Sequence, residues 1–240
     1  MRMTRDSAIV TVRWIMLGPD SAAIAPLRAL LDASEQAQAE RFRIAADRDA
    51  YIAAHALLRA TLSGAAGVAP ADWRFRTAEG GKPELDPDQA PPDLQFSLSH
   101  TRGLAACAVG RPRALGIDAE AWREPAPLEL AERYFAPAEA RLLADQAPDQ
   151  RPSAFYRLWT LKEAYLKATG QGLAAPLDSF AFSLDPVTFS GDAPASWHFA
   201  EFRPGPAHSL ALAVRSPVPI PVDAAAISLH DCLGPSDRVP

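Results

Sequence analysis

The sequence is poor in cysteine, with only Cys107 and Cys232 among its 240 residues. Two cysteines cannot build a framework of several disulfides, and they cannot supply the four ligands of a cysteine zinc site. Cys107 lies in an apolar segment, and we expect both thiols to be reduced. Neither disulfides nor a cysteine-bound metal is therefore expected to organise the fold.

Long apolar runs are also missing. No stretch approaches the roughly 18–20 consecutive apolar residues of a membrane-spanning helix. Near the N-terminus Arg2 and Arg5 precede an apolar stretch, but Asp6 and Arg13 interrupt it and no cleavage-like segment follows. We therefore expect a cytoplasmic protein that neither spans a membrane nor carries a secretory signal.

Positive charge is not in excess, since 24 lysines and arginines face 29 acidic residues and the net charge is −5. This balance argues against a nucleic-acid-binding protein, because affinity for phosphate backbones depends on clustered basic residues. A chain of this length with 48% hydrophobic residues can bury a sizeable core, as one large or two smaller domains.

One acidic segment has the pattern of a strand with two functional faces. From Ala114 to Glu120 apolar residues alternate with small or acidic ones. A strand would place Asp118 and Glu120 on one face, and Leu115 and Ile117 on the other. Two carboxylates would then point in the same direction.

A second acidic position lies on a predicted helix that includes the stretch Trp159 to Gly170. Trp159, Glu163 and Lys167 recur every four residues and share one stripe of this helix, while Lys162 lies about 100° around the axis from Glu163. The helix therefore presents a carboxylate flanked by two lysines.

Three acidic side chains from these two elements would suit a hard cation such as Mg²⁺, and the lysines beside them would suit phosphate groups. Two simpler interpretations stay open. Asp118 and Glu120 could form a solvated strand face, and Glu163 with Lys167 could be an ordinary helical ion pair that contributes about 0.2–0.5 kcal/mol.

Two further motifs precede these, Gly81-Lys82-Pro83 and Phe96-Ser97-Leu98-Ser99-His100. In their order and spacing the four motifs resemble the 4′-phosphopantetheinyl transferase superfamily, specifically its two-lobed monomeric type first associated with surfactin synthetase. The resemblance covers roughly residues 41–182. It implies transfer of the phosphopantetheine arm of coenzyme A to a serine of apo acyl or peptidyl carrier proteins, with Mg²⁺ required and adenosine 3′,5′-bisphosphate released.

The resemblance also implies roles for individual residues. Asp118, Glu120 and Glu163 would hold Mg²⁺, and Glu163 would be the leading candidate for the general base. Lys162 and Lys167 would contact phosphate, and Lys167 would in addition neutralise the departing bisphosphate.

Coenzyme A itself would be contacted by Ser99, His100 and Lys82. The chain departs from the family at the 3′-phosphate end, because Ile52 stands where some relatives carry an arginine. Arg48 lies one helical turn earlier and is the substitute we predict, with the alternative that it is only a solvated arginine at a helix start. Arg41, Arg43 and Arg59 are further nearby substitutes.

The expected fold is α+β. The resemblance implies two similar αβ lobes with antiparallel sheets, related by a pseudo-twofold axis, with the active site between them in a monomer. We place the lobes at residues 1–115 and 116–216, followed by a proline-rich tail at 217–240 that forms an extended or partly mobile arm. The periodicity predicts strands near residues 9–17, 73–76, 94–98, 104–109, 114–120, 179–184, 197–202 and 209–214, and helices near 27–31, 47–63, 128–135, 138–145 and 153–169. Gly64 is expected to cap the helix over 47–63.

Two other functions use the same residues. A metal-dependent phosphohydrolase acting on coenzyme A would employ water as the nucleophile, and a non-catalytic module would only bind coenzyme A or a carrier protein. The remaining histidines are expected to be structural, with only a small chance of function for His55; these are His55, His198, His208 and His230.

Overall fold

The structure is a computed structural model that describes residues 9–18, 21–77, 83–172 and 175–233. Its contacts divide the chain into two compact units. The first runs up to Pro112 and takes in the chain from Ile220 onward, and the second is Arg113–Pro219. The boundary thus falls slightly before the expected one, and most of the expected separate tail is grouped with the first unit.

The first unit is built on a four-stranded sheet with the order β11-β1-β5-β4. Its strands are β1 (Val10–Met16), β4 (Gln95–Thr101), β5 (Leu104–Gly110) and β11 (Val222–Ala226). Every residue of β5 is buried, as expected for a central strand. The β1–β5 and β5–β4 pairs are antiparallel, whereas β11 is parallel to β1. Residues 222–226 of the expected tail are therefore extended, as one of the two alternatives had it, and they form an edge strand of the sheet. Pro217, Pro219 and Pro221 precede β11, and no proline lies within it.

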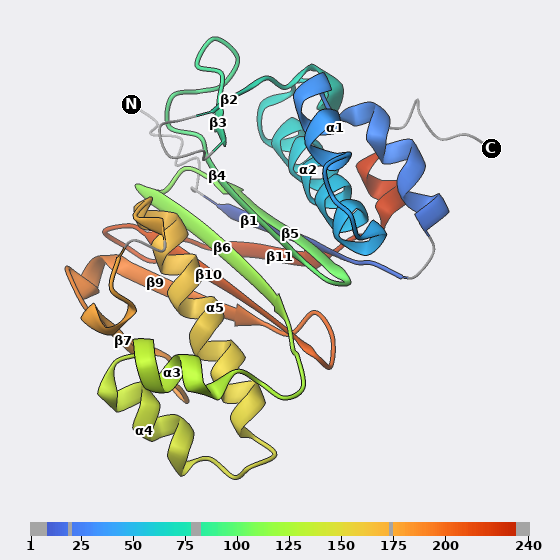
Figure 1. Cartoon of the computed structure of the whole chain (residues 1–240). Coiled ribbons are helices and arrows are strands. Elements are labelled where there is room, and N and C mark those ends of the chain that lie inside the picture. Colours follow the sequence, from blue (N-terminus) through green and yellow to red (C-terminus); the bar gives the residue numbers. More distant parts are fainter. Residues whose placement is uncertain (1–8, 19–20, 78–82, 173–174, 234–240) are drawn as a thin grey trace, which may run out of the picture. The chain divides into compact units, whose positions relative to one another are not determined.

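Helices cover one face of this sheet in Figure 1. They are α1 (Ala33–Ala39) and α2 (Ala45–Ala66), with short 3-10 helices η1 (Ser21–Leu30), η2 (Pro70–Asp72) and η6 (Leu229–Cys232). A hairpin of β2 (Phe75–Thr77) and β3 (Pro83–Leu85) completes the unit. Helix α2 ends later than predicted: Gly67, with φ 73°, caps it and donates to Ser63 O at 2.8 Å. Gly64 is an interior helical residue, which a long helix tolerates at a cost of about 1 kcal/mol.

The second unit contains an antiparallel sheet with the order β6-β10-β9, made of β6 (Ala114–Ala121), β9 (Trp197–Phe202) and β10 (His208–Arg215). The long helix α5 (Arg151–Thr169) packs on β6 and β10. Figure 1 shows α3 and α4 beside α5. The smaller elements are α3 (Leu128–Tyr134), α4 (Pro137–Asp145), η4 (Leu177–Ser179), β7 (Ala181–Ser183), β8 (Thr188–Ser190) and η5 (Pro194–Ser196). Helices and mainly antiparallel strands in both units confirm the predicted α+β class. No helix in the described part of the chain is long and apolar enough to cross a membrane.

Gly116 is the point at which α5 lies closest to β6. A Cβ atom added there would overlap the carbonyl oxygen of Ala164 and lie 2.6 Å from the backbone nitrogen of Ala168. Both are backbone atoms of α5, so no flexible side chain could move aside. The glycine therefore allows the helix to approach the strand that carries Asp118 and Glu120.

We expect Gly116→Ala to lower the free energy of unfolding by about 1–3 kcal/mol, because the added methyl group must push α5 away from β6. Urea unfolding followed by circular dichroism would measure this. Gly64→Ala is the matched control, since a Cβ there meets nothing within 4 Å. That control should stabilise α2 by roughly 0.5–1 kcal/mol. Equal stability of Gly116→Ala and the wild type would show that the close approach is not required.

Candidate active site

Strand β6 presents its two acidic side chains to α5. Gly116 faces α5, and Asp118 and Glu120 lie on the same face because side chains alternate along a strand. Leu115 and Ile117 point to the opposite face and are buried. The predicted division of this strand into an acidic and an apolar face is therefore confirmed.

Helix α5 brings a lysine onto this acidic face. Lys167 Nζ donates a hydrogen bond to Asp118 Oδ1 at 2.8 Å. The side chain of Asp118 is 6% exposed, while that of Lys167 is 32% exposed. Glu163 lies one turn before Lys167 and interacts electrostatically with both Asp118 and Lys167. Residues far apart in the sequence thus form one charged cluster, which also includes Glu120.

Two glutamates of the cluster have raised pKa values. Burial raises the pKa of Glu120 to about 7, and the charge of Asp118 adds to the rise. Burial likewise raises the pKa of Glu163 to about 6, again with a contribution from Asp118. The ammonium group of Lys167 opposes both shifts. A cation bound beside these carboxylates would oppose the shifts in the same way and lower both pKa values.

The donor atoms fit a hard divalent cation in their chemistry. All three candidate ligands are carboxylates, which Mg²⁺ prefers. Glu163 Oε1 is buried and has no hydrogen-bond partner in the part of the chain that the structure describes. Within that part, no three His, Cys, Asp or Glu side chains are grouped as a ready metal site. Asp118 is instead paired with Lys167.

Two tryptophans support the acidic face, and sequence reasoning did not find their roles. The Trp159 indole hydrogen-bonds to the side chain of Glu120, which lowers the pKa of that carboxyl group. Trp122 Nε1 donates to Ser209 Oγ at 2.9 Å, and Ser209 is the partner of Glu120 across the β6–β10 pair. The signal for Trp159 was its place in the same helical stripe as Glu163.

Lys162 lies in surroundings that differ from the predicted phosphate contact. Only 1% of it is exposed, and its ammonium group pairs with Glu139 at 2.7 Å. It also donates to the carbonyl oxygens of Leu177 and Phe180. Because α5 turns Lys162 toward α4 and η4, the side chain lies inside the second unit and is not available to a phosphate.

In the first unit, Ser99 and His100 lie within β4 and not beyond its end. Ser99 is buried, and His100 is half-buried with its ring edge-on to Tyr51 (5.8 Å between centroids) and Phe42 (6.3 Å). These aromatic neighbours limit the orientations that the imidazole can take. A contact of Ser99 or His100 with coenzyme A stays a prediction.

The basic residues proposed for the 3′-phosphate have different environments. Arg48 is in the first turn of α2, has a side chain that is 37% exposed, and approaches Asp49 Oδ1 to 3.7 Å. Ile52, one turn later, is buried in the core. Lys82 lies outside the described residues. Arg48 thus keeps the accessibility that a phosphate contact requires.

Arg59 is removed from that group, because it is fully buried. Its guanidinium group donates to Glu35 Oε2 at 2.6 and 2.9 Å and to the carbonyl oxygens of Pro70 and Trp73. Glu35 Oε1 in turn lies 2.7 Å from His55 Nδ1. These residues tie α1, α2 and the chain after α2 together, which is consistent with the structural role expected for His55.

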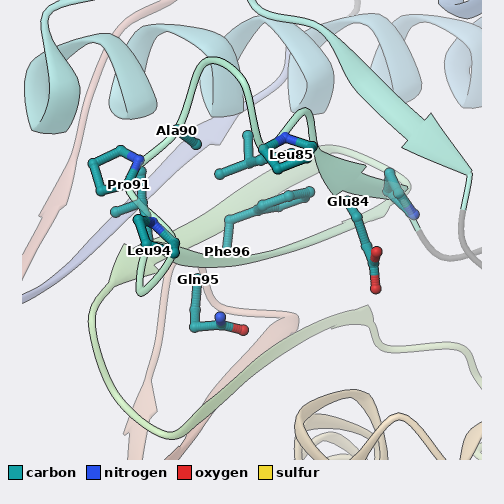
Figure 2. Close-up of a pocket in the computed structure, with 10 residues that line it drawn as sticks. Glu84, Leu85, Ala90, Pro91, Leu94, Gln95 and Phe96 are labelled. Atoms are coloured by element: carbon teal, nitrogen blue, oxygen red, sulfur yellow. The ribbon is translucent and has the colours of Figure 1, made fainter.

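A pocket of about 300 Å³ lies in the first unit, along the segment from Pro83 to Phe96. Figure 2 shows Leu85 and Phe96 close together in it, while Gln95 points in the other direction, as strand alternation requires. The carboxylates of β6 and α5 do not line this pocket. Its described lining begins at Pro83, the residue after Lys82 in the sequence, and includes one charged residue, Glu84.

Comparison with known proteins agrees with the motifs. Residues 114–214 match the 4′-phosphopantetheinyl transferase superfamily, and residues 17–111 match the family described as 4′-phosphopantetheinyl transferase, N-terminal. The chain is 42% identical over 162 residues to the 4′-phosphopantetheinyl transferase HetI of Nostoc sp., which covers 67% of this chain and 68% of HetI.

Two proteins of Bacillus subtilis are also similar. A 4′-phosphopantetheinyl transferase is 35% identical over 158 residues, or 66% of this chain and 68% of that one. The 4′-phosphopantetheinyl transferase Sfp is 38% identical over 128 residues, or 53% of this chain and 55% of Sfp. The solved holo-[acyl-carrier-protein] synthase of Thermotoga maritima aligns at 24% identity with a TM-score of 0.36, over 43% of this chain and 62% of that one. That likeness is too weak to inform the fold.

The raised pKa of Glu120 predicts a pH-dependent stability. The folded-state pKa of about 7 lies above the usual 4.5, so in metal-free protein this group stabilises the fold below pH 4.5 and loses that contribution as pH rises through 7. In EDTA, Glu120→Gln should therefore raise the Tm by several degrees at pH 8 and by less at pH 5.

Thermal unfolding at both pH values would test this expectation. The control is Glu132→Gln on the exposed face of α3. Its Tm should differ from that of the wild type by the same small amount at both pH values. A Tm difference for Glu120→Gln that does not change with pH would contradict the electrostatic account.

Proposed function

This chain belongs to the 4′-phosphopantetheinyl transferase superfamily, as its motifs predicted, and we propose that it transfers the 4′-phosphopantetheine arm of coenzyme A to a serine of apo acyl or peptidyl carrier proteins. The products are holo carrier protein and adenosine 3′,5′-bisphosphate. The observation that carries the proposal is the cluster of Asp118, Glu163 and Lys167, assembled from two motifs by the packing of α5 on β6.

The reaction requires a base, because a serine hydroxyl is a poor nucleophile near neutral pH. The carrier serine oxygen bonds to the phosphorus that bears the pantetheine arm, and the bond from that phosphorus to the bridging pyrophosphate oxygen breaks. Glu163 takes the serine proton. Its buried Oε1 has no hydrogen-bond partner in the described part of the chain, so this oxygen is not already occupied by a protein donor.

The leaving group is itself a phosphate, so negative charge grows on the bridging oxygen. Lys167 is the chain's own group for this charge, because its ammonium is about one third exposed at the edge of the cluster. Preorganised charge of this kind is usually the largest contribution to phosphoryl-transfer rates. Its hydrogen bond to Asp118 holds the ammonium in place before the substrate arrives.

The ligands of Mg²⁺ would be Asp118, Glu120 and Glu163. When bound, the ion neutralises pyrophosphate charge and lowers the pKa of the groups around it. Two properties of the residues support this. Burial, together with the charge of Asp118, raises the pKa of Glu120 and Glu163, and the ligands are carboxylate oxygens.

Contacts of coenzyme A with the first unit are proposed for Ser99, His100, Arg48 and Lys82. The pseudo-twofold relation of the two units, a site built from both, the monomeric state and the cytoplasmic location all stay predictions. Lys162 is not part of the proposed phosphate site, because its side chain is buried inside the second unit.

The proposal is tested by the mass of apo carrier proteins after incubation with coenzyme A, Mg²⁺ and this protein. The wild type should add one phosphopantetheine to a carrier serine, and EDTA should prevent the addition. Asp118→Ala and Glu163→Gln should each reduce the rate by about 10²-fold or more, because each removes a group that acts on the reacting phosphate.

Asp72→Asn, an exposed position in η2, is the control and should leave the rate unchanged. Cleavage of coenzyme A without modification of any carrier would identify a phosphohydrolase instead. Intact coenzyme A with binding alone would identify a non-catalytic module. Near-normal kcat of Glu163→Gln in saturating Mg²⁺ would remove Glu163 as the base.

For Lys167 we expect a separation of kcat from substrate affinity. Lys167→Ala should lower kcat by about 10²-fold while the KM for coenzyme A changes little, since the charge it neutralises develops during the reaction. Steady-state kinetics with a saturating carrier protein would measure both constants. Equal loss of kcat and affinity would assign Lys167 to ground-state binding.

A further inference from the structure

The ammonium group of Lys162 has all of its hydrogen bonds satisfied inside the second unit. Nζ lies 2.7 Å from Glu139 Oε2, 2.7 Å from Leu177 O and 2.9 Å from Phe180 O. Three N–H donors thus meet three acceptors. The rings of Phe180 and Phe135 lie 4.4 and 5.1 Å from Nζ. No N–H remains for a substrate phosphate.

Both carboxylate oxygens of its partner Glu139 also have hydrogen-bond partners, and the side chain is completely buried. Oε2 also accepts from Ala136 N at 3.0 Å, at the start of α4, and Oε1 accepts from Phe182 N at 2.9 Å in β7. Burial raises the pKa of Glu139 and lowers that of Lys162, and the attraction between the two opposes both shifts. The pair therefore joins α4, α5, η4 and β7 through one charged contact.

The choice of lysine here runs against the composition of the chain. Lysine accounts for only three of its 24 basic residues, and arginine for the others. A guanidinium group is a planar fork suited to carboxylates, whereas an ammonium is compact and directs its donors separately. Convergence of one carboxylate and two carbonyl oxygens on a single nitrogen suits the lysine.

Stability alone does not account for such a pair. The cost of removing two charges from water is large, and apolar residues of similar volume often stabilise a fold equally well. The pair can instead fix the direction in which the side chains of α5 point. Lys162 and Glu163 are adjacent on α5, so their side chains leave the helix about 100° apart. Anchoring one on α4 and η4 fixes the direction of the other toward β6.

We propose that Lys162 is a positioning residue that, together with Glu139, fixes the rotation of α5 so that Glu163 and Lys167 face Asp118. The roles of Glu163 and Lys167 rest on the proposed function, and the contact that holds both residues in place is the ion pair of Lys162 with Glu139. A displacement of about 1 Å at a reacting group can cost about 10²-fold in rate, so small rotations of α5 matter.

A double-mutant cycle separates positioning from phosphate binding. The variants are Lys162→Met, Glu139→Gln and the two combined, in the full-length protein. Lys162→Met leaves a buried carboxylate without its counter-charge. We expect it to lower the Tm and to reduce kcat by about 10-fold or more at a temperature where circular dichroism shows it folded, with the KM for coenzyme A within about 3-fold of the wild type.

The double variant removes both charges while glutamine can still accept from Phe182 N, so most of the lost kcat should return. Glu139→Gln alone should lower kcat although Lys162 is intact. A phosphate contact would behave differently: Lys162→Met and the double variant would raise the KM and the Kd for coenzyme A equally, without rescue, and Glu139→Gln would leave kcat unchanged. That pattern would overturn the proposal.

Arg157→Met/Glu201→Gln is the matched control. Arg157, also on α5, pairs with Glu201 at 2.8 Å and with the exposed Asp185 at 3.0 Å, and neither contact involves α4 or η4. It should change the Tm with little effect on kcat. A lowered Tm with unchanged kcat for Lys162→Met would likewise overturn positioning and leave only a structural pair.

If the wild type modifies no carrier, the proposed function fails while the packing inference can still be tested. Trp159 lies on α5 against Phe155 and Phe135 and hydrogen-bonds to Glu120. The near-ultraviolet circular dichroism of the protein, to which Trp159 contributes as one of five tryptophans, should change in Lys162→Met and recover in the double variant. An unchanged signal in Lys162→Met would overturn the rotation of α5 independently of activity.

Discussion

The close contact of α5 with β6 at Gly116 is the constraint on which the candidate site depends. Backbone atoms of Ala164 and Ala168 occupy the space that any side chain at Gly116 would require. Asp118 follows Gly116 on the same face of the strand, and Glu163 and Lys167 lie on the adjoining surface of the helix. With α5 this close to β6, Lys167 hydrogen-bonds Asp118 at 2.8 Å.

That contact also explains the electrostatics of the cluster. Packing a helix against an acidic strand removes water from carboxylates that repel one another, so the pKa of Glu120 and of Glu163 rises. The surrounding fold tolerates this unfavourable arrangement because its apolar core is formed by other residues of α5, such as Phe155, Leu158 and Leu161. Carboxyl groups with perturbed pKa values, on an element that is held in place by apolar packing on its other face, are common where a protein binds a cation or a charged substrate.

The two lysines of α5 carry the same ammonium group but differ in burial. Lys162 and Lys167 belong to one motif and could both have contacted phosphate. Lys167 is partly exposed beside Asp118, whereas Lys162 is enclosed by Glu139, two carbonyl oxygens and two aromatic rings. For this reason we propose Lys167, and not Lys162, for contact with substrate charge, and Lys162 for the positioning of the helix.

The amino-acid sequence by itself determined the family, the α+β class, the two faces of β6 and the shared stripe of Glu163 and Lys167, because these follow from short-range periodicity and motif spacing. Tertiary structure alone decided which basic side chains are buried and which are partly exposed. The partners of Lys162 and Arg59 come from segments distant in sequence, such as Glu139 and Glu35, and no local pattern reveals them. For the same reason the sequence did not show that the chain beyond Pro221 returns to pair with β1 as an edge strand, since strand pairing depends on long-range contacts.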